Sequence, residues 1–159
     1  SEIGKRTREF IKNDQLQPSD KFKPIKCFDV NMNKFDWNSV KGKKFTIIVG
    51  GLWCMTHGMD NSLPKQYFES IKEKYGDSHQ LILYVYCNDS EEMKEEIKVF
   101  GLEDYTVISD FKGGATPFTS IYNCQATPTC IYTDAEGIIV NIMEGLDPNY
   151  LENEFILKQ

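Results

Sequence analysis

A cysteine and a histidine three positions apart stand where an expected strand gives way to an expected helix. Cys54 and His57 follow the apolar run at residues 45–49, and residues 63–75 carry apolar side chains at helical spacing. A cysteine at a helix N-terminus meets unpaired N–H groups and the positive end of the helix dipole, which both favour the thiolate. A protonated His57 favours it further. The pair therefore predicts a reactive thiol at Cys54 that attacks a disulfide and forms a mixed disulfide.

Release of a mixed disulfide normally needs a second thiol, and the sequence contains no C-x-x-C pair. Three alternatives stay open: an external thiol resolves it, another cysteine of the chain does so, or no turnover occurs. Cys87 is the closest internal candidate for a resolving thiol, because it ends the strand expected beside residues 45–49. The alternative interpretation of Cys87 is a small apolar residue at a strand end. Cys124 and Cys130 are expected to be structural, and Cys27 receives no role.

Metal and cofactor binding receive little support from the residue pattern. Cys54 and His57 supply one soft ligand and one nitrogen ligand, and Cys87 is an uncertain third. The glycine pair at 113–114 is not followed by Lys-Ser/Thr at the spacing of a phosphate-binding loop. We therefore expect neither a metal ion nor a cofactor.

Length and charge limit the classes of protein that this chain can represent. It has 159 residues, a net charge of -6, 40% hydrophobic residues and 13% aromatic residues, which suits one globular domain. The acidic balance argues against nucleic acid as a partner, since phosphate binding needs a basic face. No apolar run approaches the roughly 18 residues of a membrane span. Because the chain starts at Ser1, a leader or lipid anchor could have been removed.

Apolar spacing and turn residues divide the chain into an N-terminal extension, residues 1–23, and one α/β domain, residues 24–159. The extension is expected to hold a short helix at 2–12 and a linker. Two short strands at 25–30 and 35–37 are expected to form a hairpin, and His79 is expected in a solvated polar loop. The other expected strands cover 45–49, 81–86, 105–109, 130–133 and 138–143, and the expected helices cover 63–75, 90–100, 118–122 and a segment from 147. This order predicts a central mixed sheet covered on both sides by helices.

The order of several short motifs resembles a known family over residues 24–157. Lys41-Gly42-Lys43 precedes the first strand, Trp53-Cys54 follows it, and Asp89 follows the second strand. The segment 122–134, with Gly137, is similar to a family stretch in which Tyr-Gly-Val leads to Pro-Thr, a strand and an Asp-x-x-Gly hairpin. Together these motifs resemble the thioredoxin-like superfamily, and within it the TlpA/ResA-type thiol-disulfide oxidoreductases, which are related to the peroxiredoxins.

This resemblance implies a thioredoxin-like fold and a substrate-binding edge. In the family, a cis proline lies beside the active-site cysteine, and the residue before it pairs with an extended substrate segment. These roles pass to Pro128 and Thr127, and Trp53 and Met55 are expected to line the same binding surface.

Two departures from the family pattern concern the chemistry. His57 stands where the family has its second active-site cysteine, and Gly51 stands where peroxiredoxins carry Thr or Ser. We therefore weigh two functions. The first is a thiol-disulfide oxidoreductase in which Cys54 is the nucleophile and His57 stabilises the thiolate and donates a proton. The alternative is a non-catalytic binding module that holds a peptide or a partner protein in the same groove.

Partners and location follow from the resemblance alone. It implies protein or peptide thiols and disulfides as partners. It also implies the bacterial periplasm or another extracytoplasmic side, with a membrane tether through a removed N-terminal segment as a further expectation.

Overall fold

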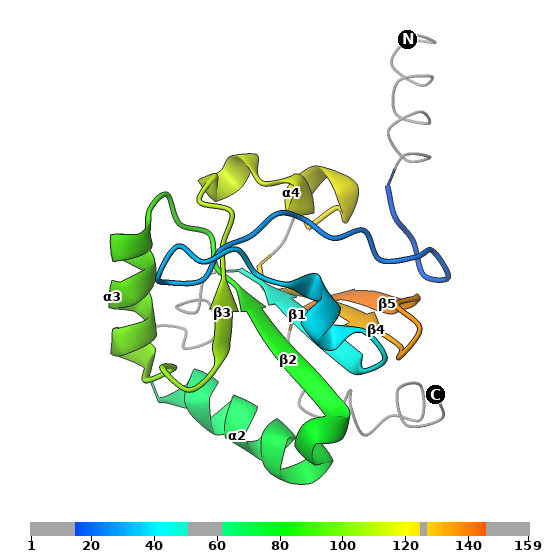
Figure 1. Ribbon diagram of the computed structural model, residues 1–159, viewed down its shortest axis with the longest axis horizontal. Coiled ribbons are helices and arrows are strands. Elements are labelled where there is room, and N and C mark those ends of the chain that lie inside the picture. Colours follow the sequence, from blue (N-terminus) through cyan, green and yellow to red (C-terminus); the bar gives the residue numbers. More distant parts are fainter. Residues whose placement is uncertain (1–14, 51–61, 125–126, 146–159) are drawn as a thin grey trace, which may run out of the picture.

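A computed structural model describes residues 15–50, 62–124 and 127–145 of the protein. The expected helices at 2–12 and from residue 147 lie outside these ranges. Five strands form one sheet in the order β3-β2-β1-β4-β5 (Figure 1). Strands β1 to β3 are parallel to one another, β4 runs antiparallel to β1, and β5 runs antiparallel to β4. The strands are β1 (Lys44–Val49), β2 (His79–Tyr84), β3 (Thr106–Ile108), β4 (Thr129–Thr133) and β5 (Ile139–Glu144).

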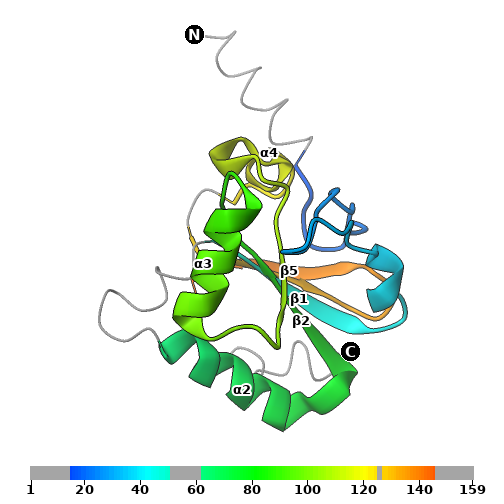
Figure 2. The same cartoon turned by 60° about the vertical axis from the view of Figure 1, so that its left-hand side comes forward.

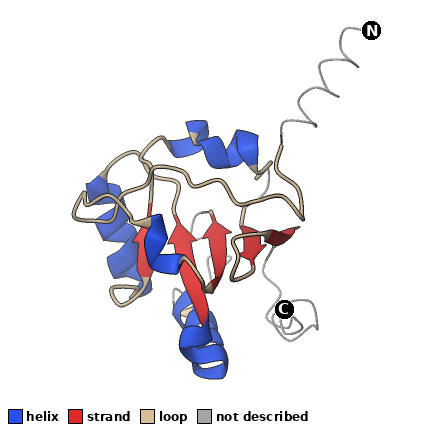
Figure 3. Ribbon diagram, turned by 45° about the vertical axis from the view of Figure 1, so that its right-hand side comes forward, coloured by secondary structure: helices blue, strands red, loops and turns tan. Residues whose placement is uncertain are grey.

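Alternating side chains of the strands supply two separate cores, one on each face of the sheet. Helices α2 (Leu63–Tyr75) and α3 (Ser90–Phe100) cover the first face, where Phe68 and Met93 pack against Leu83. The short helix α4 (Pro117–Ile121) and the chain before β1 cover the second face (Figures 2 and 3). The prediction of a central mixed sheet flanked by helices is therefore confirmed. Three 3-10 turns complete the described elements: η1 (Trp37–Val40), η3 (Gly76–Ser78) and η4 (Gly113–Ala115).

The helix ends follow local sequence signals. Helix α2 starts with a proline in its first turn and ends before Gly76, whose φ of 57° suits a residue without Cβ. At α3 the cap is Asp89, since its carboxylate accepts a hydrogen bond from Glu92 N at 2.9 Å. None of the helices in the described ranges is long and apolar enough to cross a membrane.

The expected hairpin at 25–30 and 35–37 is wrong in extent, because only a single antiparallel bridge joins Phe28 to Lys34. The outward backbone groups of Phe28 instead exchange two hydrogen bonds with Ser109, the residue after β3. Asp36 then caps the turn η1 by accepting a hydrogen bond from Asn38 N at 3.0 Å. The second expected strand therefore gives way to a helical turn at Trp37.

His79 was expected in a solvated loop, and this prediction is wrong. It opens β2, its side chain is 8% exposed, and its Nε2 lies 2.5 Å from Thr46 Oγ1. Burial, and to a smaller extent the positive charge of Lys44, lowers its pKa from 6.5 to about 4. The strand was expected over the apolar run 81–86, but it begins two residues earlier and includes His79.

Candidate functional site

The structure describes the frame around the candidate site but not its centre. The predicted site residues Trp53, Cys54, Met55 and His57 all lie outside the described residues, in the segment 51–61. That segment joins the carboxyl end of β1 to the start of α2. Among the described residues, Gly50 just after β1, its neighbours Thr127 and Pro128, and Cys87 show how this edge of the sheet is arranged.

Gly50 fixes the exit of β1 against the Thr127–Pro128 segment. A Cβ placed on Gly50 would lie 3.2 Å from both Pro128 Cα and Thr127 Cβ, and the φ of Gly50 is +154°. Its N–H donates a hydrogen bond of 3.0 Å to the Tyr84 carbonyl on the neighbouring strand. Cys54 follows four residues later, so chain length alone keeps its Cα within roughly 14 Å of that of Gly50.

The Thr127–Pro128 segment is itself held on its other side. The peptide bond between these residues is cis. The Pro128 carbonyl accepts a hydrogen bond of 2.8 Å from Gly145 N, just after β5. Thr127 is exposed and Pro128 is half-buried, so both border the surface next to the exit of β1.

Cys87 lies at the same edge of the sheet, as expected. It comes three residues after Tyr84, the register partner of Val49 at the end of β1. The Cys87 side chain is 3% exposed and borders a hollow of about 590 Å³ that Glu92, Glu95 and Glu96 of α3 also line.

The surroundings of Cys87 hold it in the thiol form. Burial, opposed in part by a hydrogen bond with Ser109 and aided by the nearby carboxylates of Glu96 and Glu92, raises its pKa to about 11. At pH 7 a group with that pKa is about one part in ten thousand thiolate. In this arrangement Cys87 is a poor nucleophile.

The other described cysteines are also buried free thiols. Burial raises the pKa of each of them to about 12, which suits structural roles for Cys124 and Cys130. Within residues 15–50, 62–124 and 127–145, no three His, Cys, Asp or Glu side chains come together as a metal site would require.

A buried carboxylate that the sequence analysis missed lies near this edge. Asp110, 8% exposed, accepts hydrogen bonds from the Tyr84 hydroxyl at 2.5 Å, the Thr116 hydroxyl at 2.7 Å and Lys112 N at 3.1 Å. Thr116 in turn accepts a hydrogen bond from Phe118 N and caps α4.

Tyr84 therefore connects two segments at this edge of the sheet. Its carbonyl accepts a hydrogen bond from Gly50, and its hydroxyl, through Asp110, fixes the loop that leads into α4 and on towards Pro128.

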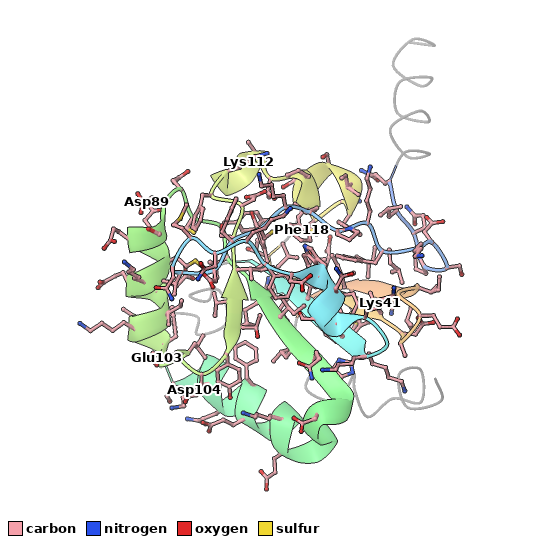
Figure 4. All side chains as sticks on the ribbon, in the orientation of Figure 1. Lys41, Asp89, Glu103, Asp104, Lys112 and Phe118 are labelled. Carbon is pink, nitrogen blue, oxygen red and sulfur yellow. The ribbon has the colours of Figure 1, made fainter. Side chains whose placement is uncertain are left out.

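Figure 4 shows Asp89, Lys112 and Phe118 at this edge of the molecule, and Glu103 and Asp104 at the far end of α3. The sequence signal that could have indicated the loop 110–116 is the pair Thr116-Pro117, which is typical of the start of a helix.

Comparisons with solved structures give close matches of fold at low sequence identity. The C-terminal domain of a Bacteroides thetaiotaomicron protein assigned to the thiol-disulfide oxidoreductases matches with a TM-score of 0.71 and 15% identity, over 90% of this chain and 98% of that one. A thiol-disulfide oxidoreductase from Bacteroides fragilis matches with a TM-score of 0.68 and 14% identity, over 90% and 100% of the two chains. An exposed lipoprotein thioredoxin from Streptococcus pneumoniae matches with a TM-score of 0.65 and 19% identity, over 84% and 98%.

By sequence alone, no family model matches the chain, and no curated protein matches it. The structural matches cover nearly the whole of each neighbour, so the likeness is one of complete domains. The chain has the thioredoxin-like fold.

Proposed function

We propose that this chain of thioredoxin-like fold is a thiol-disulfide oxidoreductase of the TlpA/ResA type, which acts on protein or small-molecule disulfides through Cys54. The observation that carries the proposal is the packing of Gly50 on Thr127 and Pro128. It joins the strand that leads to Cys54 to the segment that we assign to substrate binding. The structural neighbours, which are thiol-disulfide oxidoreductases, support the same class of chemistry.

In the proposed reaction, the Cys54 thiolate attacks one sulfur of a substrate disulfide. A bond forms between Cys54 Sγ and that sulfur, the substrate S–S bond breaks, and the second substrate sulfur leaves as a thiolate. His57 stabilises the attacking thiolate and donates a proton to the leaving one. Trp53, Met55, Thr127 and Pro128 are proposed to hold the substrate segment.

The second half of the cycle needs another thiol. An external thiolate attacks Cys54 Sγ of the mixed disulfide, forms a disulfide with Cys54 and releases the remaining substrate sulfur as a thiolate. A second external thiolate then attacks the external sulfur of that disulfide, forms the oxidised external disulfide and releases the Cys54 thiolate. The burial and raised pKa of Cys87 favour this external route. Cys87 stays the candidate for an internal route, in which it would have to become exposed and lose its proton.

A turnover assay with matched variants tests the proposal. With glutathione as reductant and insulin as the disulfide substrate, the wild-type chain should accelerate insulin reduction. Cys54→Ser should lower the rate to that of glutathione alone, and His57→Ala should lower it by about 100-fold or more if His57 handles the proton.

Cys87→Ser is the matched control and separates the two routes of resolution. It should keep the wild-type rate if an external thiol resolves the mixed disulfide, whereas loss of turnover would assign that step to Cys87. No acceleration by the wild-type chain with any thiol donor would overturn the proposed activity and leave a binding module.

We also propose an extracytoplasmic location. The support is the likeness to a thioredoxin that is an exposed lipoprotein in Streptococcus pneumoniae. A membrane tether stays a prediction from the sequence. Cell fractionation of a tagged full-length protein would test the location, and recovery with cytoplasmic markers would contradict it.

A further inference from the structure

A small hollow with aromatic walls lies at the end of the sheet opposite the candidate site. Its volume is about 260 Å³, and it is bordered by Phe45, near the start of β1, and by the turn 135–137 between β4 and β5. Gly50 and the candidate site lie beyond the other end of β1. We call it the aromatic hollow, defined by Lys21, Phe22, Trp37, Lys41 and Phe45.

Three rings form the aromatic wall of the hollow. The Phe22 ring centroid lies 5.1 Å from that of Trp37 and 5.3 Å from that of Phe45. Phe22 and Phe45 are buried, while Trp37 is half-buried. The Trp37 indole N–H donates a hydrogen bond of 2.8 Å to the Ile25 carbonyl, so this ring is held in place with its polar atom satisfied. The wall therefore offers a fixed surface for another planar ring.

Two lysines border the hollow. Lys21 and Lys41 are exposed, and within the described part of the chain neither ammonium has an ion-pair partner. Figure 4 shows Lys41 beside the turn η1, far from Asp89. Glu136 also borders the hollow, which leaves one positive charge in excess in a chain whose net charge is -6. This local excess favours an anionic ligand.

The dimensions limit the ligand to one or two rings. Ligand pockets commonly measure about 300 to 1,000 Å³, so a hollow of about 260 Å³ lies just below that range. The glycines Gly42 and Gly137 line it, and a Cβ on either would meet nothing within 4 Å, so the hollow is open beside both.

We propose that the aromatic hollow binds a small aromatic carboxylate. Its ring would pack against Trp37 and Phe45, and its carboxylate would pair with Lys41 and Lys21. The hollow contains none of the candidate site residues, so this binding does not depend on the proposed redox function.

The test is an NMR titration of the full ¹⁵N-labelled chain with indole-3-acetate. The Trp37 indole N–H signal is assigned by its persistence in a Trp53→Phe variant. We expect saturable shifts of the Trp37 indole signal and of the Gly42 and Gly137 amides at millimolar ligand. Absence of a saturable shift at Trp37 would overturn the proposal.

Charge variants and a neutral ligand decide whether the lysines recognise the carboxylate. Lys21→Gln/Lys41→Gln should weaken binding at least about threefold, as expected for two exposed charge contacts. Lys43→Gln, a nearby exposed lysine outside the hollow, should leave it unchanged. Indole-3-acetamide should bind the wild-type chain as weakly as the acid binds the double variant. Equal binding of acid and amide, or equal weakening by Lys43→Gln, would contradict recognition of the carboxylate.

Discussion

The backbone of Gly50 lies against that of Pro128, so that a Cβ on Gly50 would stand 3.2 Å from Pro128 Cα. This contact ties the exit of β1 to the start of β4, two places that are 78 positions apart in the sequence. Cys54 follows Gly50 by four residues in the sequence, so the contact places the start of the segment that carries the candidate nucleophile beside Thr127 and Pro128.

Gly50→Ala should destabilise the protein by about 2–4 kcal/mol. The methyl group meets Pro128 and Thr127, and an alanine at a φ of +154° is strained. Urea unfolding gives the free energy of unfolding. Gly42→Ala is the control, because its φ is +80° but its Cβ would meet nothing within 4 Å, so only the strain of about 1 kcal/mol applies. Equal losses in the two variants would show that the contact with Pro128 contributes nothing.

The stability of the protein should depend on His79 between about pH 6.5 and pH 4. The pKa of His79 falls from 6.5 to about 4 in the folded chain, mainly through burial. As the pH falls, His79 therefore takes up a proton in the unfolded chain before it does so in the folded chain. The contribution of neutral His79 to the free energy of unfolding is fully present above pH 6.5 and is lost as the pH falls to about 4. The loss attributable to this histidine amounts to at most about 3 kcal/mol.

His79→Gln tests this dependence. The variant should be less stable at pH 7, since the contact with Thr46 changes, but its free energy of unfolding should fall less steeply from pH 6.5 to pH 4 than that of the wild type. Urea unfolding at four or more pH values in this range gives both slopes. Parallel slopes would contradict a depressed pKa at His79.

Thiol labelling should distinguish one of the five cysteines. Burial raises the pKa of Cys87 to about 11 and those of Cys27, Cys124 and Cys130 to about 12. At pH 8 iodoacetamide should therefore modify one thiol per folded chain rapidly, and peptide mapping should locate it at Cys54.

The pH profile of this labelling completes the test. The rate at Cys54 should level off above a pKa at or below about 8.5, the value of a free cysteine, and labelling at Cys87 should rise only as the pH approaches 11. A Cys54 pKa above the free value would contradict activation of the thiolate, and rapid labelling of Cys87 at pH 8 would contradict its burial.

Tyr84 and Asp110 should be energetically coupled. Each of Tyr84→Phe and Asp110→Asn should lower the free energy of unfolding by about 1–3 kcal/mol, because each leaves a buried polar partner with altered hydrogen bonding. The double variant should lose at least about 0.5 kcal/mol less than the sum of the two. Glu95→Gln, at an exposed position of α3, should change little. Additive losses would show that the Tyr84–Asp110 hydrogen bond does not couple them.

Elements with strong local signals were predictable from the sequence. The apolar run before Gly50 gave β1, and the spacing of residues 63–75 with Gly76 gave α2. In both, the side-chain pattern and the terminating residues agree with the packing, so local and tertiary preferences favour the same structure. The edge position of Cys87 was predictable too, because parallel strands bring their carboxyl ends together.

Features that depend on distant partners were not predictable. The segment around Phe28 forms only one bridge of the expected hairpin, and its backbone pairs instead with Ser109, 81 positions away. His79 is buried because Thr46 lies on the adjacent strand, and Asp110 is buried because Tyr84 and Thr116 surround it. A polar residue next to an apolar run carries no local sign of such a partner. The arrangement of Trp53, Cys54, Met55 and His57 stays a prediction.

The most direct test of the central claim is the reaction of the reduced protein with glutathione disulfide, followed by mass spectrometry of the intact chain and its peptides. The account predicts an adduct of one glutathione on Cys54 that persists until a thiol is added, release of one glutathione thiol per chain, and neither product in Cys54→Ser. Cys87→Ser should still form the adduct. An adduct that forms equally in Cys54→Ser, or no adduct in the wild type under conditions that modify a free cysteine, would contradict thiol-disulfide exchange at Cys54.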